Sequence, residues 1–140
     1  METLCLKGRI FSGKGEGAKF LNLTWARKQI EEKLSFSPYP GTLDIRLTRN
    51  SIKIKRVLMK AAGIEILPAP GYYRGKLFKA NLKNLRCAVV IPEVPSYPED
   101  VVEVISSTNL RERLHLVDGS LCEVEVTIWP VFFFCAPKSP

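Results

Sequence analysis

The chain has 140 residues, of which 46% are hydrophobic and 25% are charged. This composition is typical of a globular protein and excludes a largely disordered one. The length suits one domain with a core of its own. The net charge of +7 favours an anionic partner, such as nucleic acid, an acidic surface or a phosphorylated small molecule, without choosing among them.

The cysteine and histidine content argues against a zinc site. There is one histidine, and the four cysteines are widely spaced with no C-x-x-C pair: Cys5, Cys87, Cys122 and Cys135. We see no secretory signal at the start of the sequence, so we expect a cytoplasmic protein with reduced cysteines. The longest apolar run, residues 128–136, is shorter than the ~20 residues that span a bilayer.

Short apolar runs between ten prolines and nine glycines favour strands joined by turns. In the first half of the chain we expect a strand over residues 4–11 and a short strand over residues 20–23. A helix should follow over residues 25–34, with Thr24 as its N-cap. The next strand should lie around Thr42.

The second half of the chain is also rich in strand patterns. Residues 52–62 are ambiguous, because they suit either an alternating strand or a helix that ends at Gly63. The other expected elements are a strand over 64–67, a hairpin of 76–82 and 85–91, a strand over 101–105, a helix over 109–114 capped by Asn109, and a strand over 120–128. Strands outnumber helices, so we predict a mainly β fold: a small closed barrel with one or two short helices.

A glycine-rich loop follows the first expected strand. Gly13, Gly15 and Gly17 alternate with Lys14 and Glu16, so the backbone can turn sharply and present N–H groups to an anion. The spacing matches neither a P-loop nor a dinucleotide-binding fingerprint. A plain hairpin turn is the alternative interpretation.

The strand near Thr42 carries a second candidate site. Leu43, Ile45 and Leu47 share one face, while Thr42 and Asp44 share the other with Arg46. A hydroxyl and a carboxylate two residues apart can both reach one hard cation such as Mg²⁺. The alternative is an ordinary amphipathic strand with a solvated polar face.

Three stretches occur in a specific order along the chain. They are Gly13-Lys14-Gly15-Glu16-Gly17 followed by Phe20; Tyr39-Pro40-Gly41-Thr42-Leu43-Asp44; and Tyr97-Pro98-Glu99-Asp100-Val101-Val102-Glu103-Val104-Ile105, followed by Asn109-Leu110-Arg111-Glu112 and Leu116-Val117-Asp118-Gly119. Taken together, from residue 4 to about residue 126, they resemble the archaeal CTP-dependent riboflavin kinases.

The resemblance implies a six-stranded cradle-loop barrel that uses Mg²⁺. It implies transfer of the terminal phosphoryl group of CTP to the 5′-hydroxyl of riboflavin, which gives FMN and CDP. The expected partners are therefore these two small molecules and no membrane, and nucleic acid is the less favoured alternative.

The resemblance also implies residue roles. Thr42 and Asp44 match the family's Mg²⁺ ligands, and Glu103 matches a flavin-contacting glutamate. Glu103 is the only matched carboxylate near the acceptor, so it is a candidate base or hydroxyl-orienting group; the alternative is an outward-facing strand glutamate. The residues that match nucleotide-contacting segments are Gly13, Lys14, Gly15, Glu16, Gly17, Ala18, Thr108, Asn109, Leu110 and Arg111.

Two positions depart from the family pattern. The second metal position is more often asparagine, and Asp44 adds a negative charge beside the triphosphate. The family usually has a flavin-contacting threonine just before the Tyr-Pro-Glu-Asp stretch, where this chain has Pro95 and Ser96. Ser96 is therefore a shifted candidate for the flavin contact.

Two other classes of function remain open from the sequence. The net charge and the aromatic residues Trp25, Tyr72 and Tyr73 would suit a small basic barrel that binds nucleic acid. The second open class is a barrel that binds flavin or nucleotide without turnover. We expect residues 1–128 to form the barrel domain, and residues 129–140 to form a tail whose aromatics pack across a barrel end or form a subunit contact.

Overall fold

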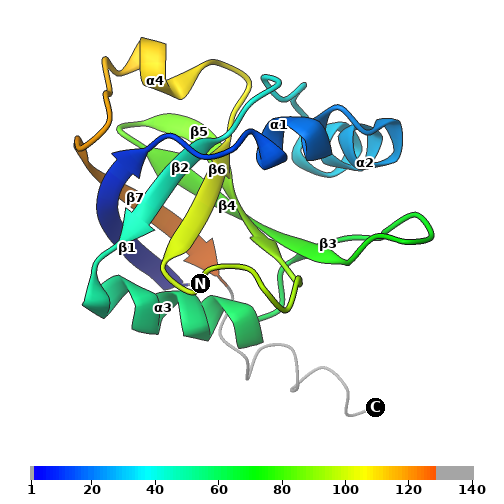
Figure 1. The fold of residues 1–140 in the computed structure, drawn as a ribbon, viewed down its shortest axis with the longest axis horizontal. Helices are drawn as coiled ribbons and strands as arrows, with labels where there is room; N and C mark the ends of the chain where they lie inside the picture. The colour runs from blue at the N-terminus through cyan, green and yellow to red at the C-terminus, as the bar shows by residue number, and fades with distance from the viewer. Residues whose placement is uncertain (1, 129–140) are drawn as a thin grey trace.

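A computed structural model of the protein describes residues 2–128. Figure 1 shows its strands and helices, whose bounds are β1 (Glu2–Phe11), α1 (Glu16–Leu21), α2 (Thr24–Leu34), β2 (Leu43–Leu47), α3 (Arg49–Lys60), β3 (Ile64–Ile66), β4 (Gly75–Leu82), β5 (Leu85–Pro92), β6 (Val101–Ile105), α4 (Leu110–Arg113) and β7 (Leu121–Ile128).

The strands form one antiparallel sheet that closes on itself. Their order is β3-β4-β5-β6-β2-β1-β7, and β7 pairs back onto β4 through Ala80 opposite Val126 and Asn81 opposite Glu125. Within the described residues, six strands therefore make a closed barrel, and β3 extends the sheet beyond β4. The prediction of a mainly β fold with a six-stranded barrel is confirmed.

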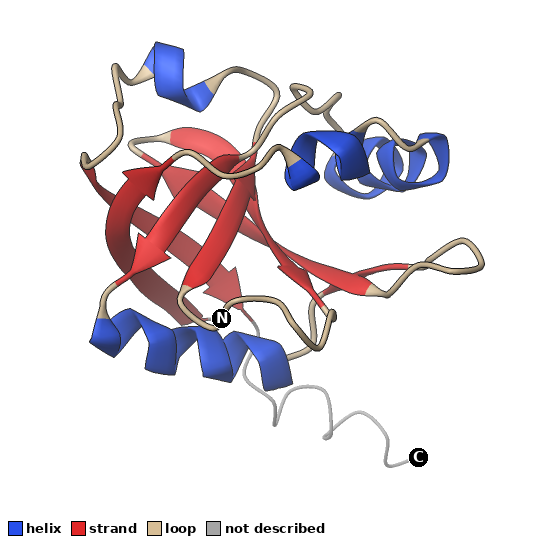
Figure 2. Cartoon of the chain, viewed as in Figure 1, coloured by secondary structure: helices blue, strands red, loops and turns tan. Residues whose placement is uncertain are grey.

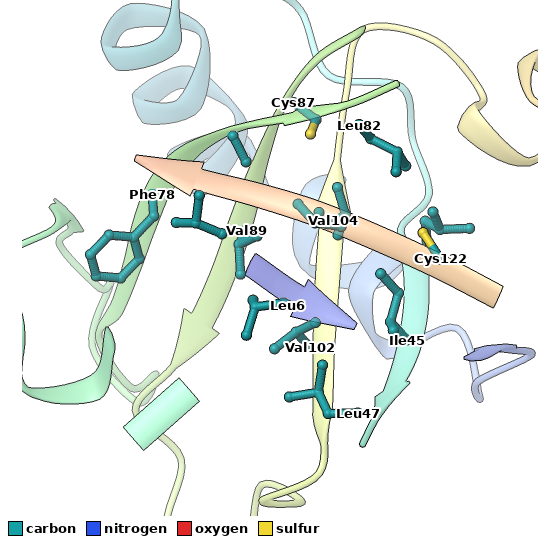
Figure 3. Packing of buried hydrophobic residues seen from close by; sticks show 14 of the residues in the cluster. Leu6, Ile45, Leu47, Phe78, Leu82, Cys87, Val89, Val102, Val104 and Cys122 are labelled. Carbon is teal, nitrogen blue, oxygen red and sulfur yellow. The ribbon is translucent and has the colours of Figure 1, made fainter. Parts of the chain in front are cut away.

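Alternating apolar side chains fill the barrel. Figure 3 shows Leu6 of β1 and Ile45 of β2 among them, packed with Val89 of β5 and Val104 of β6. All four side chains are buried. Each strand thus contributes one apolar face to a common core, as the period of two requires.

A second apolar cluster lies outside the barrel. Five consecutive residues of β5, from Cys87 to Ile91, are buried, because Ala88 and Val90 face outward beneath a covering layer. That layer includes Ile30 and Leu34 of α2, and Figure 2 shows α1 and α2 together on this side of the sheet. A strand covered on both faces reads as a continuous apolar run rather than an alternating one.

The ambiguous segment after β2 is a helix. Thr48 caps α3, since its hydroxyl accepts a hydrogen bond from the backbone N–H of Ser51 at 3.3 Å. Leu58 and Ala61 bury their side chains in the barrel core. Helix α3 therefore covers one end of the barrel, as Figure 1 shows.

Two local predictions were wrong. Residues 20–23 are not a strand, because the chain forms α1 and then a tight turn into α2, with Leu21 fully buried in the outer cluster. Thr24 is the first residue of α2 and not its cap; Leu23 is the N-cap, and it makes no side-chain capping bond. The described residues form four helices, more than the one or two expected.

Three of the four cysteines lie within residues 2–128. Cys5, Cys87 and Cys122 are free thiols. Across the part of the chain that the structure describes, no helix combines the length and apolar character needed to cross a membrane. The tail, residues 129–140, lies outside the described residues, so its packing role and the domain boundary stay predictions.

Candidate active site

A cleft of about 800 Å³ opens beside the barrel. Its walls come from the end of β1, the glycine-rich loop, α1, the polar face of β2, the loop between β3 and β4, and the segment that leads from β5 into β6. Segments from both halves of the sequence thus meet around one hollow. This hollow contains the predicted metal and flavin residues, among them Thr42, Asp44, Ser96 and Glu103.

The centre of the cleft is a cluster of three side chains, which we call the oxygen cluster: Thr42, Asp44 and Glu103. Strands β2 and β6 pair so that Asp44 stands directly opposite Glu103. Thr42 Oγ1 lies 2.7 Å from Asp44 Oδ1 and 3.0 Å from Glu103 Oε1. The single hydroxyl hydrogen of Thr42 can be donated to only one of these carboxylates. A proton or a cation is needed to balance the remaining contact.

Burial raises the pKa of both carboxyl groups in the oxygen cluster. For Asp44, desolvation is the largest cause, and it is partly offset by the Thr42 hydroxyl, the backbone N–H of Gly13 and the positive charge of Arg111. For Glu103, desolvation again leads, and the nearby Asp44 charge raises the pKa further. Two carboxylates this close repel each other when both are ionised, so the site favours positive charge.

Tyr97 completes the surroundings of Glu103. Its hydroxyl donates a hydrogen bond of 2.6 Å to Glu103 Oε2, while Thr42 contacts the other oxygen. Burial and the Glu103 charge raise the pKa of Tyr97, so it stays a donor. Tyr97 belongs to the third sequence motif, but the sequence alone assigns it no role. A separation of six residues from Glu103 does not indicate that the two side chains touch.

The glycine-rich loop packs directly against the oxygen cluster. A Cβ at Gly13 would overlap the Asp44 carboxylate, and a Cβ at Gly17 would overlap the Glu103 carboxylate and Thr42. Gly15 differs, because its surroundings are open and its φ of +80° is what requires glycine. The loop is shorter than expected, since Gly17 and Ala18 already belong to α1.

The predicted nucleotide-contacting residues of the second half of the chain line a second, smaller pocket of about 180 Å³. Thr108, Asn109, Leu110 and Arg111 lie on one side of it, and Thr42 lines both this pocket and the large cleft. Among the described residues, Thr108 Oγ1 is a buried polar atom without a hydrogen-bond partner. A ligand in this pocket could satisfy it.

Tyr39 and Arg111 join the separate motifs. Tyr39 donates its backbone N–H to the carbonyl of Ser106 at 2.7 Å, and its hydroxyl accepts from Asn109 Nδ2 at 3.1 Å. Arg111 bonds Asp118 at 2.9 Å and the carbonyl of Phe11 at 3.3 Å. These contacts hold the second and third sequence motifs next to the loop that begins after β1.

Not every predicted residue has a contact that explains it. Gly13, Lys14, Glu16 and Gly17 line the large cleft, whereas Ala18 lies on α1 beyond the lining. Ser96 is exposed on the loop before β6 and lines the cleft without a recorded partner. Its flavin role, like the metal and nucleotide roles, stays a prediction.

The fold and site define a closed six-stranded barrel with an oxygen-rich cleft. The family model CTP-dep_RFKase, described as "Domain of unknown function DUF120", matches residues 10–127. The chain therefore belongs to the CTP-dependent riboflavin kinase family, and the resemblance drawn from the sequence is confirmed.

Individual relatives agree with the family match. The chain is 44% identical over 131 residues to a riboflavin kinase of Pyrobaculum islandicum, covering 89% of this chain and 61% of the relative. It is 40% identical over 130 residues to a riboflavin kinase of Archaeoglobus fulgidus, covering 90% and 56%. A riboflavin kinase of Methanosarcina barkeri is 35% identical over 130 residues, covering 90% and 58%. The chain spans about three fifths of the length of these curated relatives.

The raised pKa of Asp44 predicts a pH-dependent gain in stability for Asp44→Asn. A carboxyl whose pKa is higher in the folded than in the unfolded state lowers stability once pH exceeds its unfolded value. Asp44→Asn should therefore unfold at higher urea concentration than the parent at about pH 7, and the difference should vanish near about pH 3. The measurement is urea unfolding across pH in a chelator.

Asp118→Asn is the matched control, for which we expect a change in stability of the opposite sign. Hydrogen bonds from Ser12 and Arg111 lower the pKa of Asp118, so this carboxylate stabilises the fold at neutral pH. Its replacement should reduce stability at neutral pH, with the loss fading on acidification. A change in stability of the same sign for both variants at neutral pH would contradict the opposite pKa shifts of Asp44 and Asp118.

The contact of Gly17 with the oxygen cluster predicts a loss of turnover for Gly17→Ala. Alanine is about 1 kcal/mol better than glycine inside a helix, so α1 itself should not suffer. The new Cβ must displace Glu103 or Thr42, so turnover should fall at unchanged or higher melting temperature. Gly15→Ala should instead lower the melting temperature, since it strains a positive φ in open space. Full activity of Gly17→Ala would refute the contact.

Proposed function

We propose that this chain transfers the terminal phosphoryl group of CTP to the 5′-hydroxyl of riboflavin, producing FMN and CDP. One observation carries the proposal: the oxygen cluster lies where the large cleft and the smaller pocket share Thr42. Phosphoryl transfer depends mainly on positioning and on neutralising phosphate charge, so a junction between two ligand sites is the place for it. The relatives named riboflavin kinase support riboflavin as the acceptor, and the family name alone supports CTP as the donor.

The smaller pocket suits part of the nucleotide. The unpartnered Thr108 hydroxyl and the side chain of Asn109 offer polar contacts there. The phosphates would then extend toward the glycine-rich loop, where the space beside Gly15 is open. Lys14 lines the cleft and adds positive charge on that side.

The donor set of the oxygen cluster fits Mg²⁺. Thr42 and Asp44 offer hard oxygen atoms 2.7 Å apart. The described residues contain no group of three or more His, Cys, Asp or Glu side chains that could hold a metal. A few protein oxygens suit Mg²⁺, which keeps positions for water and phosphate. When bound, Mg²⁺ would neutralise charge on the phosphates.

The large cleft suits the flavin. Its volume of about 800 Å³ lies within the range of small-molecule sites, roughly 300–1,000 Å³. Phe20, Tyr72 and Tyr73 contribute aromatic surface for a planar ring system. Ser96 lies at the same cleft and could bond a polar edge of the ring.

We assign Glu103 a role on the acceptor hydroxyl. Its carboxylate would orient the 5′-hydroxyl and accept its proton as the new oxygen–phosphorus bond forms. The bond to the bridging oxygen of the donor breaks at the same phosphorus, and CDP leaves with that electron pair. The raised pKa of Glu103 makes it a stronger proton acceptor than a solvated glutamate.

The nucleic-acid interpretation loses one of its supports. Trp25 is half-buried and packs against neighbouring rings, 5.3 Å from Tyr72 and 5.8 Å from Phe20 between centroids. It is therefore not a free stacking platform for bases. The oxygen cluster would also repel a polyanion that arrived without a cation.

The donor is tested by incubating the protein and Mg²⁺ with riboflavin and either CTP or ATP. We expect FMN with CTP and far slower formation with ATP, measured by chromatography with fluorescence detection. Equal use of both nucleotides would overturn the donor assignment. Binding of riboflavin or CTP without FMN would identify an inactive binding barrel, and salt-sensitive oligonucleotide binding without turnover would identify a nucleic-acid module.

The metal role is tested by measuring rate against Mg²⁺ concentration. Asp44→Ala should lower turnover and raise the Mg²⁺ requirement, with partial rescue at high metal, because one ligand oxygen is gone. Thr42→Val should do the same more mildly. Asp44→Asn keeps an oxygen ligand and should remain active. An Asp44→Ala variant that matches the parent at every Mg²⁺ concentration would make these residues an ordinary solvated strand face.

A further inference from the structure

Lys55 is a buried lysine behind the active site. It lies on α3, on the side that covers the barrel end, and only 3% of its surface is exposed. Its Nζ donates hydrogen bonds to the carbonyls of Pro98 at 2.9 Å and Val101 at 2.8 Å. The same nitrogen lies 4.9 Å from the centroid of the Tyr97 ring, within the range of a cation–π contact.

These contacts fix the segment that carries two active-site groups. Tyr97 precedes the first bonded carbonyl, and Glu103 lies two residues after the second, on β6. Tyr97 in turn donates its hydroxyl to Glu103 at 2.6 Å. A continuous set of contacts therefore runs from Lys55 through Tyr97 to the Glu103 carboxylate. Lys55 itself does not line the cleft.

We propose that Lys55 is a positioning residue that orients Glu103 toward the acceptor by holding Tyr97 and the backbone on either side of Asp100. The proposal rests on the proposed function, since it assigns a purpose to the orientation of Glu103. One ammonium group donates hydrogen bonds to two carbonyls and makes a cation–π contact with one aromatic ring.

Packing alone does not explain a lysine at this position. Burying an ammonium group costs more than burying an apolar side chain of similar size. Desolvation lowers the pKa of Lys55, while the carboxylates of Asp100, Glu99 and Glu103 act in the opposite direction. The ammonium group thus lies near three carboxylates on one segment of the chain. Two of them, Glu99 and Asp100, also form ion pairs with arginines of β2 and α3.

The test compares Lys55→Met with Lys53→Met, which removes an exposed lysine from the same helix. Both are also made in a Tyr97→Phe background, which keeps the ring but removes the bond to Glu103. We expect Lys55→Met to lower kcat about tenfold with little change in the KM for CTP, and Lys53→Met to match the parent. In the Tyr97→Phe background, Lys55→Met should cost little more, because both act through one carboxylate.

A second readout does not depend on turnover. The ring resonances of Tyr97 in tyrosine-labelled protein, assigned with Tyr97→Phe, should shift in Lys55→Met and stay in place in Lys53→Met. If the parent makes no FMN while this shift occurs, the proposed function fails and the contact between Lys55 and Tyr97 stands.

The proposal is overturned if Lys55→Met keeps the parental kcat. It is also overturned if the kcat of the double variant falls by the product of the two single-variant reductions. Should Lys55→Met not fold, Lys55→Gln retains amide hydrogens for the two carbonyls without the charge, and the same comparisons apply. Failure of both variants to fold would make Lys55 a structural residue only.

Discussion

The register between β2 and β6 is the constraint on which the site depends. Leu43 pairs with Val104 and Ile45 with Val102, and all four side chains are buried in the barrel core. The intervening pair, Asp44 and Glu103, must then face the cleft together. A shift of β2 by one residue against β6 would exchange the two faces of β2 and place Asp44 in the apolar interior. Core packing therefore holds together two acidic groups that would otherwise separate, and the free energy of apolar burial offsets their repulsion.

Strands such as β1, β2 and β7 could be predicted because buried and more exposed residues alternate along them. Leu43, Ile45 and Leu47 alternate cleanly, and their strand is confirmed. The prediction of a strand over residues 20–23 was wrong because their apolar run suits a strand as well as a helix. In the structure Leu21 belongs to a helix and packs with Ile30 in the outer cluster. That contact arises only when α1 and α2 fold against β5, so a local pattern does not contain it.

The candidate site was recoverable from the sequence only through its resemblance to a family. Alternation placed Thr42 and Asp44 on one face, as the structure has them. The contact between Thr42 and Glu103 joins residues 61 positions apart and follows from strand pairing, which spacing does not reveal. The same is true of Lys55 and Tyr97, which meet only because α3 covers the barrel end. Gly13 and Gly17 were recognised as backbone close to a ligand, yet in the structure it is carboxylates that lie against them.

Closure of the barrel also bears on how the protein resists aggregation. Each barrel strand has a partner strand on both sides, although β7 meets β4 only at Ala80 and Asn81, and among residues 2–128 β3 is the strand at the open edge of the sheet. That strand has three residues and is followed at once by a segment containing Pro68 and Pro70, which have no N–H to donate. A short edge ended by prolines is a poor template for pairing with another molecule. The chain can therefore carry long apolar strands such as β5 without exposing a continuous edge to its neighbours.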